Sequence, residues 1–235
     1  MLREPLQPDS LDVAIALEGS APARAIAVDI EQLLVRKGWL WLRSRVTDGV
    51  LEIAMGTSTR RASAPQRLTA REFQVASLSA RGLMAKEIGS ELAIMEPTAR
   101  GALGRALLKL EVGSGSRLIA MWNALSRPAQ RFDFALNQTA LVFVCDLTPR
   151  NTAVSLTSTE RAILAGILDG SSNRAISDQR GTSERTVANQ VGLIFKKFRV
   201  STRRELSAKV LGSDDTRTLE GCANSRPGID HSEEM

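Results

Sequence analysis

The chain has 235 residues, of which 43% are hydrophobic and 24% are charged, and its formal net charge is +5. This balance is typical of a soluble globular protein with one or two cores, so it excludes wholesale disorder, and no apolar run approaches the roughly 18 residues that a membrane span needs. The N-terminal residues carry Asp9, Asp12 and Glu18 in place of the basic start and apolar centre of a secretion signal, so we expect a cytoplasmic protein.

The cysteines and the single histidine exclude two further kinds of site. Cys145 lies in an apolar, strand-like run and Cys222 in a polar tail, so we expect no disulfide framework. His231 lies close to the C-terminus, away from other residues that ligate zinc or build a Ser-His-Asp arrangement. We therefore expect neither an enzyme nor a protein with a metal or organic cofactor.

Residues 1–67 are predicted to form a small α/β segment. Its elements are a strand at 11–17, a helix at 22–37, a hairpin at 39–55 and a polar linker at 56–66. Trp39 and Trp41 lie in the first strand of the hairpin, which resembles the last strands of PAS-like sensor domains. Because tryptophans of this kind are more often core or interface residues, we favour a packing or dimerisation platform over a ligand site.

An internal repeat organises the rest of the chain. A shift of 88 residues aligns 68–118 with 156–206 without gaps, and 11 of the 51 aligned positions are identical. We predict a second hairpin at 130–145, preceded by a helix at 116–126 that closes one unit and opens the next repeat. The predicted order is a first unit at 68–126, a hairpin and linker at 127–155, a second unit at 156–211 and an acidic, disordered tail at 212–235.

The second unit reads as a helix-turn-helix. Apolar residues recur at helical spacing over 159–168 and 184–198, with a shorter helix at 173–179 between them. Ser172 and Ser183 are placed to cap the second and third helices, and Gly181 suits the left-handed conformation of a tight turn. This segment resembles the LuxR/GerE-type DNA-binding domain, with matches at Leu156, Thr157, Glu160, Gly170, Ser172, Arg174, Ile176, Ser183, Thr186, Val187, Lys197, Val200, Arg203 and Leu206.

The resemblance implies a mainly α fold with two tandem four-helix units, each preceded by a helix and a β-hairpin. In this family the third helix of the unit enters the major groove. The resemblance also implies that Glu72 and Glu160, which both copies share, are structural acids.

In unit two the resemblance implies DNA contacts from the second helix, the third helix and the loop after it. These residues are Arg174, Arg185, Thr186, Asn189, Gln190, Lys196, Lys197 and Arg203. The resemblance implies that Arg174 and Lys197 hold phosphates and that Thr186 contacts the backbone of the duplex. It places Arg185, Asn189 and Gln190 at the floor of the groove, where Arg binds guanine and Asn or Gln binds adenine. Arg203 fits a capping role in the last helix equally well. Residues 156–211 contain ten Lys and Arg against five Asp and Glu, as phosphate contact requires.

Unit one has a poorer third helix. Gly101 and Gly104 each weaken a helix by about 1 kcal/mol relative to alanine. The secondary candidates for DNA contact are Lys86, Thr98, Arg100, Arg105 and Lys109, of which the two lysines fit a structural role better. Unit two is therefore the better candidate for reading sequence.

These features predict a DNA-binding transcriptional regulator of bacterial type. We expect double-stranded DNA as its partner, with a second copy of the chain or other transcription machinery as further partners, and neither a membrane nor a small-molecule ligand. The alternative is an interaction protein, derived from the same duplication, that binds another regulator or RNA polymerase in place of DNA. The lack of a catalytic constellation or a complete phosphate-binding loop argues against a third possibility, an enzyme.

Overall fold

The computed structural model describes residues 24–47, 49–58, 65–134, 138–147 and 154–211. Over these residues the fold is mainly helical, with a small antiparallel sheet. The strand predicted at 11–17 and the acidic tail predicted at 212–235 lie outside the described residues.

The described elements form two repeats in chain order. The first repeat opens with β1 (Arg24–Ile26), η2 (Gln32–Lys37), β2 (Trp41–Thr47) and β3 (Val50–Ser58). Unit one, residues 68–126, contains α2 (Ala70–Ala80), α3 (Ala85–Glu91), α4 (Glu96–Lys109) and α5 (Gly115–Leu125). After β4 (Ala129–Phe134) and β5 (Gln138–Asp146), unit two, residues 156–211, contains α6 (Ser158–Asp169), α7 (Asn173–Arg180), α8 (Glu184–Phe198) and α9 (Arg203–Leu211).

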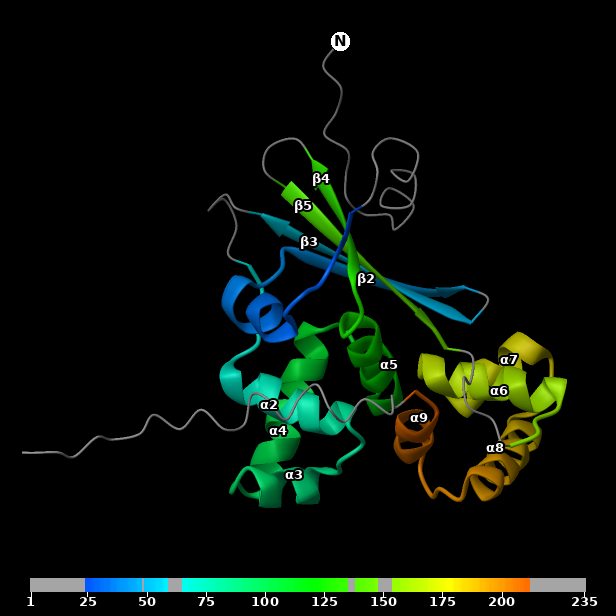
Figure 1. The fold of residues 1–235 in the computed structure, drawn as a ribbon. Helices are drawn as coiled ribbons and strands as arrows, with labels where there is room; N and C mark the ends of the chain where they lie inside the picture. The colour runs from blue at the N-terminus through cyan, green and yellow to red at the C-terminus, as the bar shows by residue number, and fades with distance from the viewer. Residues whose placement is uncertain (1–23, 48, 59–64, 135–137, 148–153, 212–235) are drawn as a thin grey trace, which may run out of the picture.

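The two predicted hairpins do not stay with separate units but join in one sheet of strand order β1-β4-β5-β3-β2. In Figure 1 this sheet lies above the two units, and α5 of unit one lies next to α9 of unit two where the units meet. Ala54 of β3 pairs with Val142 of β5, and these residues are 88 positions apart, so each is the counterpart of the other. A pseudo-two-fold axis therefore passes between them and relates the two hairpins.

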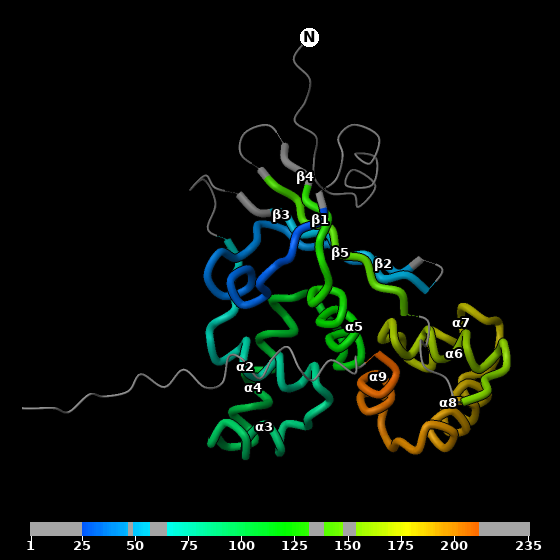
Figure 2. Tube along the Cα trace, in the orientation of Figure 1, coloured from blue at the N-terminus to red at the C-terminus, as the bar shows by residue number. Residues whose placement is uncertain are grey.

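The helix predicted at 22–37 is wrong in its first half. Residues Arg24–Ile26 form β1, which pairs antiparallel with β4 at the edge of the sheet (Figure 2). Only the last part is helical, and Gln32–Lys37 form a π-helix. Ile26 and Ile30 are four positions apart, as on one side of a helix, but strand pairing with a distant segment overrides this local pattern. The linker predicted at 56–66 also begins too early, since β3 continues to Ser58.

The core lies beneath one face of the sheet. Alternate residues of β3 and β5, including Ile53 and Phe143, are fully buried, as the two-residue period of a strand requires. Trp39 is buried as well, and Trp41 packs against Gly56, where an added Cβ would lie 2.0 Å from the indole nitrogen. Both tryptophans are thus packing residues.

Helix α5 serves both repeats, as predicted for residues 116–126. It contacts α2 of its own unit, α6 and α9 of the other, and the strands β3 and β5. The rings of Phe73 in α2 and Trp122 in α5 lie with their centroids 5.3 Å apart. Its counterpart α9 is different, because exposed Lys209 stands where α5 has buried Met121.

Candidate nucleic-acid interface

Helix α8 begins at a well-defined turn. Gly181 adopts the left-handed conformation with φ of 61°, and the Thr182 N–H donates to the Ser177 carbonyl oxygen at 3.0 Å. The hydroxyl oxygen of Ser183 accepts the N–H of Thr186 at 3.1 Å, which confirms the predicted cap. Ser172 caps α7 in the same way, through the N–H of Ala175. These local interactions fix the direction in which α8 leaves the turn.

One side of α8 packs inward and the other carries polar side chains. Val187, Val191 and Ile194 are buried among the unit's helices, so the opposite side of α8 faces solvent. Among the residues predicted to read DNA, Arg185, Thr186, Asn189 and Lys196 are exposed, and Gln190 is half-buried. Arg174, at the start of α7, is exposed too.

Arg185, Asn189, Gly192 and Lys196 lie at helical spacing on one stripe of α8, which we call the α8 stripe. No carboxylate among the described residues pairs with either cation of this stripe or with Arg174. The α8 stripe therefore presents unneutralised positive charge beside an amide that both donates and accepts hydrogen bonds.

Two of the predicted contact residues have partners inside unit two. The Lys197 ammonium lies 2.7 Å from Glu160 Oε1 and also donates to the Ser155 carbonyl oxygen. The Arg203 guanidinium donates to the Ser171 carbonyl oxygen and to Asn173 Oδ1, and burial lowers the pKa of this group. Both side chains join α8 or α9 to the first helices of the unit.

The same positions in unit one form a different surface. The α4 stripe, 88 residues before the α8 stripe, consists of Pro97, Gly101, Gly104 and Leu108. All four are exposed, and the Leu108 side chain keeps 80% of its accessible surface. Met95, at the N-terminus of α4, keeps 74%. This surface offers no side-chain hydrogen bond to a base edge.

Most of the cations predicted to contact DNA in unit one are already ion-paired. Arg100 pairs with Glu96 one turn earlier, and the Lys109 ammonium lies 2.6 Å from Glu72 Oε2. Arg105 lies 3.3 Å from the other oxygen of Glu72. Lys86 and Thr98 are exposed.

Glu72 and Glu160 are the structural acids of their units. Each accepts the backbone N–H of the threonine that caps its helix, Thr69 or Thr157. The hydrogen bond from Lys197 and that N–H hold the pKa of Glu160 below its ordinary value. Burial raises the pKa of Glu72, but Lys109 and Thr69 outweigh it and the net shift is downward.

The contacts that hold the two units together had no signal in the sequence. Arg117 of α5 pairs with Asp169 at the end of α6, 52 positions away. Arg204 of α9 donates to the Leu83 carbonyl oxygen at 3.1 Å, across 121 positions. Such pairs depend on how the units pack, which no local pattern records.

The family comparison gives the same division of the chain. The profile of the family described as bacterial regulatory proteins, luxR family, matches residues 66–122 and again residues 154–210. Both units are LuxR-family domains. Separate searches of curated proteins and of solved structures found no match. Domains of the LuxR family are DNA-binding helix-turn-helix modules with a regulatory role.

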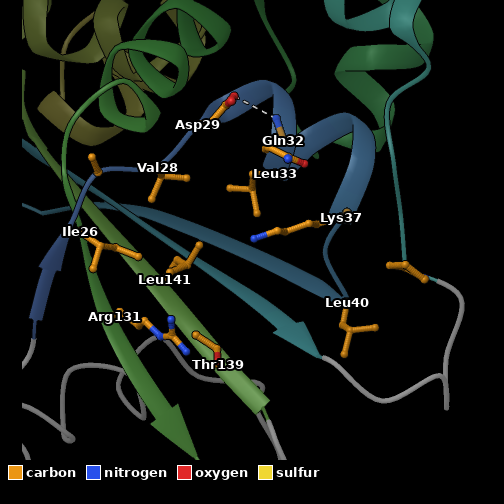
Figure 3. Close-up of a pocket in the computed structure, with 13 residues that line it drawn as sticks. Ile26, Val28, Asp29, Gln32, Leu33, Lys37, Leu40, Arg131, Thr139 and Leu141 are labelled. Atoms are coloured by element: carbon orange, nitrogen blue, oxygen red, sulfur yellow. Dashed lines mark hydrogen bonds between the residues drawn. The ribbon is translucent and has the colours of Figure 1, made fainter.

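The described residues contain no cluster of three or more side chains suited to holding a metal ion. None of their helices is long and apolar enough to cross a membrane. A cleft with a volume of about 580 Å³ lies between η2 and the strands β4 and β5, far along the chain from α8 (Figure 3).

Proposed function

We propose that this LuxR-type chain is a transcriptional regulator that binds DNA in the cytoplasm and reads the major groove mainly through α8, the third helix of a four-helix unit. The α8 stripe carries the proposal, because it combines exposure, two cations without carboxylate partners and an amide at helical spacing. Bidentate pairing of arginine with guanine or of asparagine with adenine supplies about 1–3 kcal/mol of discrimination per contact.

The roles within unit two follow from exposure and from existing partners. Arg185, Asn189 and Gln190 are proposed to face the base edges. Arg174, Thr186 and Lys196 are proposed to contact phosphates, with Arg174 and Lys196 as the cations.

Lys197 and Arg203 belong to the same predicted set, but their polar groups already bind within the unit. We assign them to holding α8 and the following loop in position. In this role they act on DNA binding through the geometry of α8.

The pseudo-two-fold arrangement supports binding by a single chain. Isolated units of this type commonly bind paired half-sites as dimers, and here the joined hairpins and the Arg117–Asp169 pair hold two units together in one molecule. We propose that unit two reads sequence while unit one provides the second, less selective contact with the duplex. A homodimer is then not required for binding.

A second candidate function is protein binding through unit one. Met95 and Leu108 are the most exposed large apolar side chains of the described residues. Leu108 lies in α4, the helix that would otherwise read DNA, and Met95 is its N-cap residue. Exposed apolar surface of this kind favours a protein partner such as another regulator or RNA polymerase. Replacing Leu108 with the lysine of unit two, Leu108→Lys, separates the two functions. It will weaken binding to purified RNA polymerase if unit one is a protein-binding surface, and will strengthen DNA binding if unit one contacts phosphates.

Selection of duplexes from a random-sequence pool by the full chain tests the main proposal. Anisotropy titrations of the recovered duplex at two salt concentrations will show specific binding that weakens steeply as salt rises, because phosphate contacts release counterions. Arg36→Ala, which removes an exposed cation far from α8 in the chain, serves as the charge control. No enrichment, together with no binding at low ionic strength, would refute the proposal.

A further inference from the structure

The cleft lies between η2 of the first repeat and the strands β4 and β5 of the second. Its volume of about 580 Å³ falls in the range of roughly 300–1,000 Å³ that small-molecule sites occupy. Ile26, Leu33 and Leu141 contribute apolar surface, and Gln32, Lys37 and Thr139 contribute polar groups (Figure 3). The duplication provides an internal control for this site, since the equivalent place is where α5 packs against β3.

The counterparts of the three polar residues are core residues. Leu125 stands 88 positions after Lys37, Ala120 stands 88 after Gln32, and Leu51 stands 88 before Thr139. All three are completely buried where α5 packs against β3. Between η2 and β5, by contrast, polar side chains line a cleft. Packing alone does not favour that exchange, because polar groups gain nothing from a position that apolar residues fill well.

The backbone of η2 departs from its counterpart in the same place. Residues Gln32–Lys37 form a π-helix, whereas the corresponding part of α5 is a regular α-helix. Gly38 ends the turn with φ of 76°, and an added Cβ would lie 2.3 Å from the Gln66 carbonyl oxygen. Single π turns are rare and frequently occur at functional sites. The residues that line the cleft are therefore held by an unusual backbone and not by a frayed helix end.

The charges above the cleft favour an anion. The Lys37 ammonium extends over the cleft and pairs with no carboxylate among the residues that the structure describes. The Arg131 guanidinium extends over it from β4. Among the described residues of the lining the carboxylate is Asp29, which accepts the backbone N–H of Gln32 at 3.0 Å and so caps the helical turn.

We propose that this cleft binds a small amphipathic carboxylic acid. The carboxylate pairs with Lys37, the apolar part lies on Ile26, Leu33 and Leu141, and Gln32 and Thr139 hydrogen-bond a hydroxyl or amide group where the acid carries one. The bound acid contacts η2. This element is joined to the start of unit one, because the Leu68 N–H donates to the Leu34 carbonyl oxygen at 2.9 Å. This assignment does not depend on DNA binding, and it places a ligand in the segment for which the sequence favoured a packing platform.

Calorimetric titration of the full chain with octanoate, decanoate and phenylacetate tests the assignment. At least one acid will bind with saturation at one site, and its neutral amide will bind at least tenfold more weakly. Lys37→Leu, which introduces the residue type of its counterpart Leu125, will weaken binding of that acid by a similar factor. Arg36→Leu removes a neighbouring exposed cation that does not line the cleft and will bind as the unchanged chain does.

A second variant distinguishes a loss of binding from a loss of the folded structure. Thr139→Leu places the counterpart's side chain in the cleft and will abolish binding while circular dichroism and thermal unfolding stay as in the unchanged chain. The assignment is overturned if none of the three acids saturates. It is also overturned if the acid binds equally well to Lys37→Leu, or if binding survives in Thr139→Leu.

Discussion

Units one and two share a framework and differ on one helix face. Both have a threonine cap, a buried glutamate and a lysine that pairs with it: Glu72 with Lys109, and Glu160 with Lys197. The α8 stripe consists mainly of polar and cationic residues, whereas the α4 stripe consists of glycine and apolar residues. The comparison shows that the interactions that preserve the fold lie in or near the core of each unit. The exposed stripe therefore differs between the units without disturbing them.

The helix-turn-helix bend shows how strongly the framework holds. Gly181 in unit two and Ala93 in unit one both have a left-handed backbone, with φ of 61° and 51°. Glycine adopts this conformation without penalty, but the Cβ of alanine makes it unfavourable. Unit one therefore keeps the bend against the preference of its own residue, because the helices on either side of the bend pack in only one way.

The largest expected effect concerns the reading residues of unit two. Arg185→Ala and Asn189→Ala will each reduce the discrimination between the selected duplex and a scrambled one by about 1–3 kcal/mol, because each removes a proposed base contact. Arg100→Ala in unit one will leave discrimination unchanged, since its guanidinium pairs with Glu96. Competition anisotropy measures all three variants. An equal or larger loss for Arg100→Ala would reverse the ranking of the units.

Exchanging the residues of the bend will have opposite effects on the two units. Gly181→Ala will lower the free energy of unfolding by about 1–2 kcal/mol, the penalty of a left-handed residue with a Cβ. Ala93→Gly will raise it by up to about 1 kcal/mol, less the entropy that glycine loses on folding. Urea denaturation measures both. Gly104→Ala is the control, since its methyl group meets nothing within 4 Å in a helix and will also stabilise. A destabilised Ala93→Gly would contradict the strain assigned to unit one.

Substitutions of the two neighbouring lysines of α8 will distinguish a residue that contacts DNA from one that stabilises the fold. Lys196→Ala will weaken binding to every duplex alike and reduce the salt slope by about 1, with no change in thermal stability, because the contact proposed for its ammonium is with phosphate. Lys197→Ala will lower thermal stability, since it leaves buried Glu160 without its cation. Salt-dependent anisotropy and thermal unfolding of both variants test this. The reverse pattern would move Lys197 into the proposed interface.

The smallest expected effect is an acid dependence of the structural pairs. Because the pKa of Glu160 is lowered in the folded chain, its stabilising contribution is complete above the ordinary value of 4.5 and is lost as the pH falls through the folded pKa. The difference in Tm between the unchanged chain and Lys197→Ala will therefore shrink below pH 4.5. Lys109→Ala will follow the same trend more weakly, because Arg105 stays 3.3 Å from Glu72. A difference that does not vary with pH would show that the ion pair is not its source.

The helices of unit two could be predicted closely from local patterns. The segments predicted at 159–168, 173–179 and 184–198 agree with α6, α7 and α8 to within one residue at either end. Caps and turn residues act over one or two helical turns, so the chain itself contains the whole signal. The strand pairing of Arg24–Ile26 could not be predicted from local patterns, because its partner, β4, lies more than 100 residues away.

The sequence by itself determined the repeat, the two helix-turn-helix units and the difference between their third helices, because all of these depend on residue type and short spacing. Only the tertiary structure decided that the hairpins join across a pseudo-two-fold axis, that Lys197 and Arg203 bind within unit two, and that a cleft lies beneath η2. Those features arise where distant segments meet. Which distant side chains become neighbours depends on the packing of the whole molecule and not on the order of residues along the chain.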